Sequence, residues 1–468
     1  MDVAGRLKAI GALSDSIVFT SFDTTGFWAD TLSVAGGWAG IRFQNSSSEP
    51  DTAMFEFCRI EYAKKFDEYG GDINGGAIKA ENYSMLIIRN CVLKSNMVIC
   101  FETGIDGPAG GAVYCKDVNT VTIEKNEFSW NRSFDNGGAI HIGQDCQTYI
   151  GHNIFHHNRA IQYRWSPPWL VVSGQGAAIG TTDDLGFSPT ICDNYCFNNE
   201  SVNGIIYTSN RQGLIYNNVI CNNAGAGIMD GHQLSATRMF NNTVINNTTF
   251  DGGILIFSRA IIYNNICWGN ERYPGQVQDQ INVSEAYPGY QLFNNCVEYG
   301  NGGANSISDY PEFIDPTEGS GLAFDGSTAD WSLKDESPCI NQGTADTTGL
   351  FIPEYDIAGN PRIYGDAIEM GAFENQNVIT EIDASEFPLN NISVFPNPGK
   401  SVINIASSQE AVFVLSTISG TIIIEKQFQT GTNTIDVESL VPGFYLYRIL
   451  SKNKSVIHSG KWIKIPAY

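Results

Sequence analysis

The chain has 468 residues, and its 27 basic against 50 acidic side chains give a formal net charge of −23 at pH 7. This charge disfavours nucleic acids and anionic membranes as partners, and a polyanionic ligand would need a local basic patch to override it. No apolar run reaches the length of about 18 residues that a membrane-spanning helix needs. The 48 glycines and abundant asparagines predict a turn-rich chain and not a helical one.

The beginning of the chain contains apolar strands but no export leader. After Met1, the stretch DVAGRLKAIGALSDSIVFTS lacks the charged start, apolar centre and cleavage site of a signal peptide. SIVFTS and the later GGWAGIRF (Gly36–Phe43) have the composition of short strands.

A repeat runs through the middle of the chain. Segments such as NCVLKSN, NEFSWN and NIFHHN recur at intervals in the mid-twenties, and most have a second Asn five positions after the first. A Gly-led apolar strand, such as GGAIK or GGAIH, alternates with them. Units this short cannot bury their own apolar residues, so we expect them to stack on one another as a solenoid. The segments open at Asn90, Asn126, Asn153, Asn194, Asn218, Asn242, Asn265 and Asn295.

Two columns of residues follow from this alignment. The position two after the opening Asn is apolar in every segment, as a continuous interior requires, and it includes cysteines. Most of the eleven cysteines should therefore be small buried side chains, with room for one or two disulfides in an exported protein. The Asn columns should form ladders of side-chain amides about 4.8 Å apart. The apolar column is Val92, Phe128, Phe155, Cys196, Ile220, Val244, Cys267 and Val297.

The pattern resembles the right-handed parallel β-helix family, with its Asn ladders and strands led by small residues. The resemblance covers residues 1–374 and implies an all-β fold, a right-handed parallel β-helix solenoid. Lyases, hydrolases, adhesins and structural proteins share this scaffold. GGWAGIRF resembles an early rung, and because an exported solenoid needs a cap before its first rung, we expect that the true N-terminus and export signal are missing.

A closing motif is expected at residues 337–374. DIAGNPRIYGDAIEMGAFE resembles the terminal motif of bacterial surface β-helix proteins, which implies a structural cap held by ion pairs. The residues that would form this cluster are Asp356, Arg362, Asp366 and Glu374.

After a polar linker at residues 375–389 the pattern changes to short alternating strands. Turns at intervals of about ten residues predict a small antiparallel β-sandwich over residues 390–468. FPNP, an SG turn, IDVESLVPGFYLYRI and GKWIKI, in this order, closely resemble the C-terminal sorting domain of type IX secretion cargo. The resemblance implies passage through the outer membrane of a Bacteroidota-like bacterium, removal of the domain, and release or attachment at the cell surface. A carbohydrate-binding sandwich is the alternative.

A candidate site follows from the alternation of side chains along the Gly-led strands. The residues next to the inward isoleucines and valines form an outward column, with Glu81 and Lys116 two positions further along. Lys79, Tyr114 and His141 would lie about 5 Å apart on adjacent rungs. We expect His141 to be exposed on a face that binds glycans. The column is Lys79, Tyr114, His141, Gly180, Tyr207, Met229 and Ile256.

A long insertion beside this column carries YRWSPPWLVV, a stretch stiffened by prolines. Trp165 and Trp169 would stack on sugar rings, and Arg164 would bind a carboxylate. The alternative is that the insertion folds back over an apolar patch of the solenoid. The basic group HHNRA, with His157 and Arg159, is expected on a turn and solvated.

The residue types of the column bear on catalysis. A polysaccharide lyase needs a base and a cation, for which Lys79, Lys116, His141 and Tyr114 are the candidates, with Tyr207 beside them. A glycosidase needs paired carboxylates, which the column lacks. Acidic turns leave Ca²⁺ open as a cofactor, although no DxDxDG spacing occurs.

These observations predict an exported or cell-surface protein, a monomer, that binds extended polysaccharide. The site would be centred on Tyr114, His141, Tyr207, Trp165 and Trp169. A lyase acting on uronate-containing glycans is the first alternative and a glycosidase the next. A purely structural surface protein remains if the tryptophan insertion is packed.

Overall fold

The structure is a computed structural model of the chain. At residues 162–166, 169–173 and Asp183 it describes the backbone alone. Within the described part, η1 (Gly326–Thr328) is a short 3₁₀ turn and every other element is a strand. The residues outside the description are 31–32, 45–50, 67–73, 100–106, 167–168, 184–186, 274–275, 277, 285, 287, 345–347, 366, 377–391, 418–420, 453, 455 and 466–468.

The largest sheet of the described chain has 18 parallel strands. It consists of two ladders side by side, which share the long strands β8 and β11. Its strands are β1 (Asp2–Val3), β2 (Leu7–Ile10), β4 (Ile41–Gln44), β5 (Thr52–Glu56), β8 (Ile78–Arg89), β11 (Val113–Glu124), β14 (Ile140–Ile142), β15 (Gln147–Gly151), β20 (Ile179–Asp183), β21 (Thr190–Cys192), β24 (Ile206–Asn210), β25 (Leu214–Tyr216), β27 (Ile228–Asp230), β28 (Arg238–Phe240), β30 (Ile254–Ile256), β31 (Ile261–Tyr263), β33 (Ile281–Val283) and β34 (Gln291–Phe293).

Two smaller parallel sheets complete the rungs. The first contains β3 (Ile17–Phe19), β6 (Cys58–Glu61), β9 (Val92–Lys94), β12 (Glu127–Ser129), β16 (Ile154–His156), β22 (Tyr195–Phe197), β26 (Val219–Cys221), β29 (Thr243–Ile245), β32 (Ile266–Trp268) and β35 (Cys296–Val297). The second contains β7 (Lys64–Phe66), β10 (Met97–Ile99), β13 (Arg132–Ser133), β17 (Arg159–Ala160) and β23 (Glu200–Ser201).

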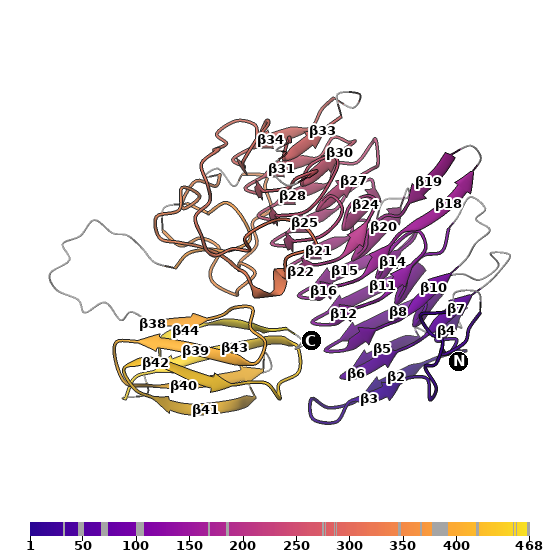
Figure 1. The fold of residues 1–468 in the computed structure, drawn as a ribbon, viewed down its shortest axis with the longest axis horizontal. Coiled ribbons are helices and arrows are strands. Elements are labelled where there is room, and N and C mark those ends of the chain that lie inside the picture. Colours follow the sequence, from indigo (N-terminus) through magenta and orange to yellow (C-terminus); the bar gives the residue numbers. More distant parts are fainter. Residues whose placement is uncertain are drawn as a thin grey trace.

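Successive rungs keep a regular register. Tyr114 pairs with Lys79 on one side and with His141 on the other, and Phe128 pairs with Phe155. Each unit therefore stacks on its neighbours, and the predicted right-handed parallel β-helix is confirmed. Figure 1 shows the rungs stacked from β2 and β3 to β33 and β34.

The interior is a continuous column of apolar side chains. Val92, however, is half-buried, and Leu93 takes the interior position opposite Phe128. The prediction for Val92 was wrong because the ladder of this rung begins at Cys91 and not at Asn90. A shift of one residue along a strand exchanges the two faces. Buried as predicted are Phe128, Phe155, Cys196, Ile220, Val244, Cys267 and Val297.

Two asparagine ladders run along the solenoid, as predicted. In the first, Asn126 Nδ2 donates to Asn153 Oδ1 at 3.0 Å, and the same bond repeats from rung to rung as far as Asn295. The second runs from Asn96 to Asn270. Because these amides are buried, their mutual hydrogen bonds satisfy polar groups that would otherwise destabilise the core.

Two cysteines extend the first ladder. Cys91 N donates to Asn126 Oδ1 at 2.9 Å, and Cys58 N donates to Cys91 Sγ at 3.3 Å, so a thiol takes the place of an amide oxygen. The cysteines that the structure describes are all buried, as expected for interior side chains, and none of them is in a disulfide. Cys100 lies outside the described residues.

Beyond the last rung the chain turns back along one flank of the solenoid. In this closing segment β36 (Phe313–Asp315) and β37 (Asp330–Leu333) pair antiparallel. Asn198 Nδ2 donates to Phe324 O and Asn222 Nδ2 to Gly319 O, both at 2.8 Å. Asparagines on the solenoid turns therefore anchor the segment through its backbone.

The predicted ion-pair cluster lies in the closing segment. Arg362 is buried, and its Nε lies 3.8 Å from Glu374 Oε2. Asp356 Oδ2 accepts a hydrogen bond from Glu374 N at 2.8 Å. Glu369, which the motif did not single out, is buried beside them, while Asp366 lies outside the described residues. The cluster thus holds more carboxyl groups than cations.

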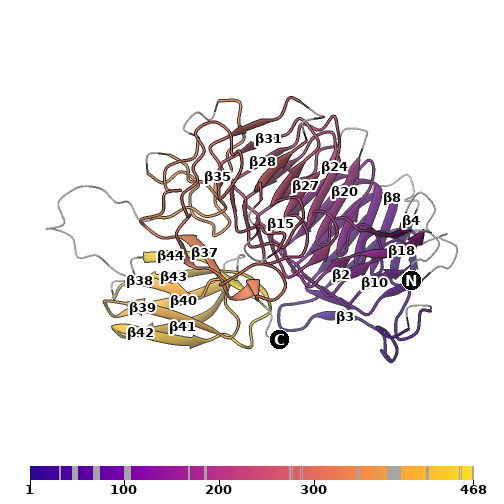
Figure 2. The same ribbon diagram turned by 45° about the horizontal axis from the view of Figure 1, so that its top comes forward.

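The C-terminal strands form the predicted antiparallel sandwich. One sheet contains β38 (Ile392–Phe395), β39 (Val402–Ser407) and β42 (Gly431–Asp436). The other contains β40 (Ala411–Thr417), β41 (Ile422–Phe428), β43 (Gly443–Leu450) and β44 (Val456–Lys464). Figures 1 and 2 show this sandwich against one flank of the solenoid.

Candidate functional site

The outward column has the predicted register over most of its length. Lys79, Tyr114, His141, Gly180 and Tyr207 pair in this order on successive rungs. The assignment of Ile256 was wrong: Leu255 pairs with Met229, and Ile256 is buried in the core. This rung has one residue fewer between its glycine and the outward position, and such a displacement exchanges the inward and outward faces.

The expected exposure of this column was also wrong. His141 is 6 % exposed, and Lys79, Tyr114 and Tyr207 are buried as well. The Tyr114 and His141 rings stack with centroids 5.7 Å apart, and Lys79 Nζ lies 3.0 Å from Glu81 Oε2. Strand alternation shows which side of the sheet a residue occupies, but not what packs against that side. The column is a packed layer and not an open face.

The imidazole of His141 is enclosed. Burial lowers its pKa to about 4, so the ring is neutral at neutral pH. Its Nε2 lies 3.4 Å from Thr182 Oγ1, whereas its buried Nδ1 has no hydrogen-bond partner among the residues described. A Cβ at Gly180 would lie 3.2 Å from that nitrogen, so the glycine makes room for the ring. Lys116, on the same strand as Tyr114, is half-buried.

The tryptophan insertion forms a hairpin of β18 (Gln162–Ser166) and β19 (Trp169–Ser173), which Figure 1 shows projecting from the solenoid. The side chains of Arg164, Trp165 and Trp169 lie outside the described part of the structure. Their role in binding therefore stays a prediction.

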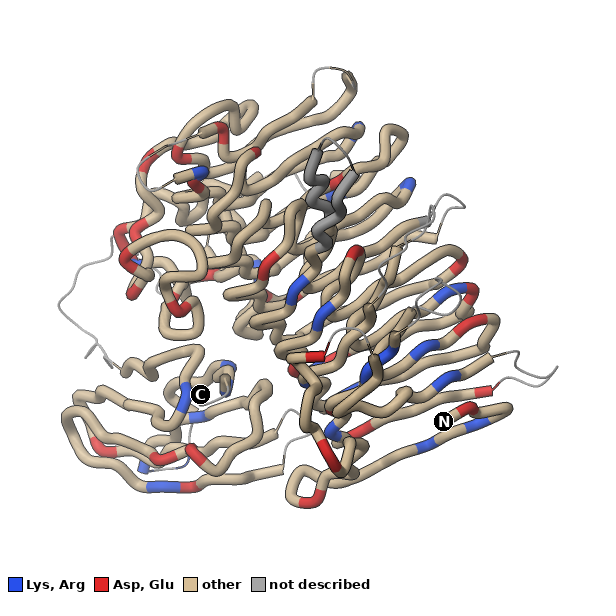
Figure 3. Tube along the Cα trace, turned by 45° about the vertical axis from the view of Figure 1, so that its right-hand side comes forward, with Lys and Arg blue, Asp and Glu red and all other residues tan. Residues whose placement is uncertain are grey.

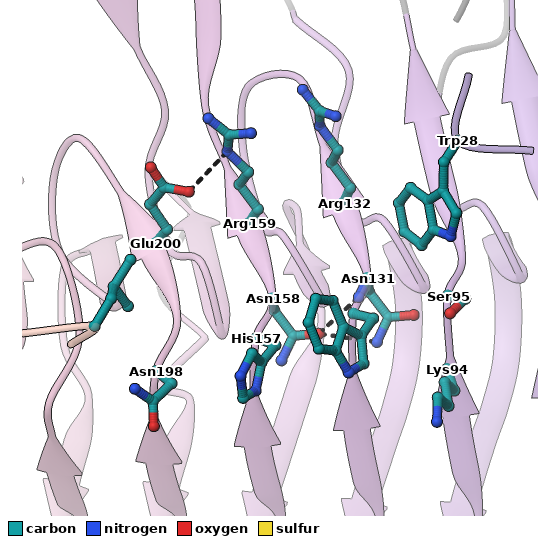
Figure 4. A pocket seen from close by; sticks show the side chains of 12 residues that line it. Trp28, Lys94, Ser95, Asn131, Arg132, His157, Asn158, Arg159, Asn198 and Glu200 are labelled. Atoms are coloured by element: carbon teal, nitrogen blue, oxygen red, sulfur yellow. Dashed lines mark hydrogen bonds and ion pairs between the residues drawn. The ribbon is translucent and has the colours of Figure 1, made fainter. Parts of the chain in front are cut away.

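An open groove of about 690 Å³ lies on another corner of the solenoid, where the ten-stranded sheet turns into the five-stranded sheet. Figure 4 shows its lining on successive rungs. The lining residues are Trp28, Lys94, Ser95, Trp130, Asn131, Arg132, His157, Asn158, Arg159, Asn198, Glu200 and Leu322.

The groove is built on a column of left-handed residues. The residue before each Asn of the second ladder from Asn96 to Asn247 has φ between 53° and 58°, and Gly269, before Asn270, has φ 62°. Asparagine tolerates this conformation well, whereas a bulky side chain rarely adopts it. Where the closing segment covers the column, asparagine occupies it and binds that segment's backbone. Where the groove opens, Trp130 and His157 replace it. The column is Ser95, Trp130, His157, Asn198, Asn222 and Asn246.

Two exposed tryptophans form the aromatic part of the groove. Trp130 is 40 % exposed and stacks on His157, with ring centroids 4.4 Å apart. Trp28 is 46 % exposed and lies in the N-terminal region, where the neighbouring Phe27 is buried against Met97. Trp28 and Trp130, which are far apart in the sequence, thus both line one groove.

Cationic side chains follow the groove over three rungs. Arg132 pairs in register with Arg159, and Lys94 lies on the preceding rung. Arg159 Nε lies 2.9 Å from Glu200 Oε2, and the Arg132 guanidinium lies 4.5 Å above the Phe134 ring. Figure 3 shows Lys and Arg recurring on adjacent rungs of this acidic protein. The groove thus carries the cations Lys94, Arg132 and Arg159, of which Arg159 is paired with Glu200.

His157, the histidine in the groove lining, is neutral at neutral pH. Burial, and then the neighbouring His156, lower the pKa of His157 to about 4. The His157 Nδ1 lies 3.1 Å from His156 Nδ1, and His156 Nε2 lies 3.2 Å from Glu127 Oε1. The imidazole of His157 therefore offers a ring face and a hydrogen bond, but no charge.

The prediction that HHNRA is a solvated turn was wrong in part. His156 is buried, while His157 and Arg159 are half-buried in the groove wall. The sequence carried a signal for this: NEFSWN and NIFHHN have Trp130 and His157 where NYCFNN, NVICNN and NTVINN have asparagine. The groove also includes Trp28. This residue lies outside the repeats, so aligning them does not place it beside Trp130 and His157.

The comparisons with known proteins concern the C-terminal sandwich. Residues 393–464 match the family described as the secretion system C-terminal sorting domain. No curated protein matches the chain. Among the described residues, no group of three or more His, Cys, Asp or Glu side chains is placed to hold a metal ion. In the same part of the chain, no helix has the length and apolarity to cross a membrane.

Proposed function

We propose that this protein, which its sorting domain exports by type IX secretion to the cell surface or beyond, binds an extended acidic polysaccharide in the groove of Trp28 and Trp130. The observation that carries the proposal is Trp130 itself. A non-glycine residue in the left-handed region costs roughly 1–3 kcal/mol, and such strain concentrates at binding sites. Although its indole stacks on His157, Trp130 stays 40 % exposed, so part of the ring is open to a ligand.

The groove matches the chemistry of an acidic sugar chain. The C–H faces of pyranose rings pack on indole faces, so Trp28 and Trp130 would hold two points of the chain. Carboxylate or sulfate groups accept charge-assisted hydrogen bonds from Arg132 and Arg159, and Lys94 would attract a further anion. Because these cations lie on successive rungs about 4.8 Å apart, the arrangement suits a regularly charged polymer running along the solenoid.

The test compares wild type with Trp130→Asn, because asparagine is the residue that other rungs use at this position. Binding of the full-length protein to pectate, alginate, sulfated glycosaminoglycan and a neutral glucan would be measured by affinity electrophoresis and calorimetry. We expect acidic polymers to bind, with affinity lowered at least about tenfold in the variant, a change of about 1.4 kcal/mol. The Tm should not fall, because the strain is relieved.

Tyr299→Asn is the matched control, since Tyr299 is an exposed aromatic residue outside the groove. It should bind as wild type does. Equal binding by wild type and Trp130→Asn would remove the groove from the site. A fall of several degrees in Tm without any loss of affinity would make Trp130 a structural residue, and the protein a structural one at this surface.

A uronate lyase centred on His141 is the second candidate. Its support is the neutral imidazole, whose Nδ1 has no hydrogen-bond partner among the described residues, and its stacking on Tyr114, which pairs in register with Lys79. A neutral imidazole removes a proton α to a carboxyl group, and an ammonium group stabilises the resulting enolate. The test follows ultraviolet absorbance of unsaturated uronates, with Ca²⁺ present. A rise that is lost in His141→Gln supports the lyase. No rise with wild type on any uronate polymer rejects it.

A further inference from the structure

The last strand of the sorting domain, β44, carries a lysine into the contact with the solenoid. Lys461 is 6 % exposed, and its Nζ donates to Ile357 O at 2.7 Å. The same nitrogen lies 3.2 Å from His152 Nδ1 and 3.9 Å from the centroid of the Phe444 ring. The solenoid and its closing segment thus supply the polar partners of a cation that belongs to another domain.

Two carboxyl groups, Asp193 on the solenoid and Asp356 in the closing segment, line the same cavity as this ammonium group. Burial lowers the pKa of Lys461 to about 8, while Asp193 and Asp356 act in the opposite direction. Asp193 Oδ2 lies 3.6 Å from His152 Nε2, and Asn217 donates to Asp193 Oδ1 at 3.1 Å. An ammonium group is buried only at a large desolvation cost unless it has such partners. His152, Asp193 and the carbonyl group of Ile357 thus form a socket of polar groups around the lysine.

At the other turn of each rung, asparagine is again replaced by other residues, as it is in the groove. The residue before each Asn of the first ladder is also left-handed, with φ between 51° and 59°. Asn217 and Asn241 in this column bind the backbone of the closing segment, at Tyr355 O and Glu369 O. Beside the sorting domain, the column changes to Lys125, His152 and Asp193.

Apolar contact and a second ion pair surround the socket. Phe444, Ile463 and Ile465 of the sorting domain share one buried cluster with solenoid residues that include Ile154 and Tyr195. At another edge, Lys400 Nζ lies 2.7 Å from Asp325 Oδ2. The interface between the sorting domain and the rest of the chain thus has an apolar centre and two lysines with polar partners, Lys461 and Lys400.

We propose that the socket of His152, Asp193 and Ile357 is a docking site for the sorting domain, strong enough to hold it without the covalent link. The domain then stays bound to the solenoid after the chain is cut between residues 376 and 392. This inference does not depend on the glycan proposal, because the socket lies on a different turn of the rungs.

The test inserts a site-specific protease sequence between residues 376 and 392 of the full-length protein. After cleavage, we expect the two fragments to elute together on gel filtration. Lys461→Met keeps the alkyl chain but removes the charge, and Asp193→Asn changes only the solenoid side. Each should raise the dissociation constant of the cut fragments at least about tenfold, and the double variant should show that the two effects are not additive.

Lys426→Met, on exposed strand β41, is the matched control and should leave the complex intact. Protease resistance of each fragment shows whether the variants have folded, and Asp193→Asn leaves the sorting domain unaltered. Separation of the wild-type fragments on cleavage would overturn the proposal. If the affinity is unchanged in both Lys461→Met and Asp193→Asn, the apolar contacts alone hold the two fragments together. This result would contradict the role proposed for the socket.

Discussion

Two residues in each middle rung have a left-handed backbone, and each precedes a buried ladder asparagine. Asparagine is the ordinary occupant because it tolerates this conformation and its amide can bind a covering segment. Trp130 and His157 replace it at the open groove, whereas His152 and Asp193 replace it under the sorting domain. The residues at these positions therefore differ between the covered corner, the open groove and the contact with the sorting domain, while the ladder behind them stays unchanged.

The buried His141 predicts a loss of stability in acid. Its folded pKa of about 4 is below the ordinary value of 6.5, so as the pH falls the unfolded chain binds a proton first. This contribution is complete above about pH 6.5 and is lost toward pH 4, by roughly 2–3 kcal/mol. In urea titrations at several pH values, His141→Gln should show a shallower acid decline than wild type. Parallel profiles would show that His141 does not titrate as its burial implies.

At the scale of the elements, the ladders hold the short strands in register. Strands of three residues have few backbone bonds of their own, so the asparagine amides supply much of the polar contact between rungs. Asn223 is typical of them. Its Nδ2 donates to Cys196 O, Cys221 O and Asn247 Oδ1, and its Oδ1 accepts from Asn199.

Replacing this asparagine should be costly. Asn223→Ala removes all of these bonds and leaves buried donors and acceptors without partners, which should lower the free energy of unfolding by about 3 kcal/mol or more. Chemical denaturation followed by circular dichroism measures the change. Asn301→Ala, at an exposed turn with one backbone bond, should cost less than about 1 kcal/mol. Equal effects of the two substitutions would contradict a structural role for the ladder.

At the scale of the whole molecule, acidic side chains outnumber basic ones, and the same is true of the buried cluster in the closing segment. Burial raises the pKa of Glu374 to about 9 and that of Glu369 to about 7, although Arg362 acts against both shifts. The folded protein therefore keeps protons that the unfolded chain releases near pH 4.5. Stability from these groups is present at low pH and declines as the pH rises toward 9.

The buried His141 lowers stability in acid, and the buried carboxyl groups lower it at alkaline pH. Stability is therefore greatest in mildly acidic to neutral solution. Glu374→Gln removes the ionisation and keeps the shape, so thermal unfolding between pH 6 and pH 9 should depend less steeply on pH than in wild type. We expect the variant to be more stable than wild type at pH 9 by at least about 1 kcal/mol. A variant with the wild-type slope would show that other groups control the alkaline side.

Much of the fold could be predicted because the chain repeats itself. An apolar column and two asparagine columns, each at a constant offset, are satisfied only by stacking, and the order of motifs after residue 390 identified the sorting domain. The register failed at Val92 and Ile256, where one residue more or less in a turn moves a side chain to the opposite face. Local composition does not reveal such a shift.

The sequence by itself determined the architecture and the route of export, because both depend on patterns that each segment carries within its own residues. Only the tertiary structure decided which surfaces are open. His141 is buried although strand alternation places it outside the core, and the groove exists because a turn near Trp28 meets rungs that carry Trp130 and His157. Exposure and grooves depend on what packs against a strand from distant parts of the chain, and no local pattern records that.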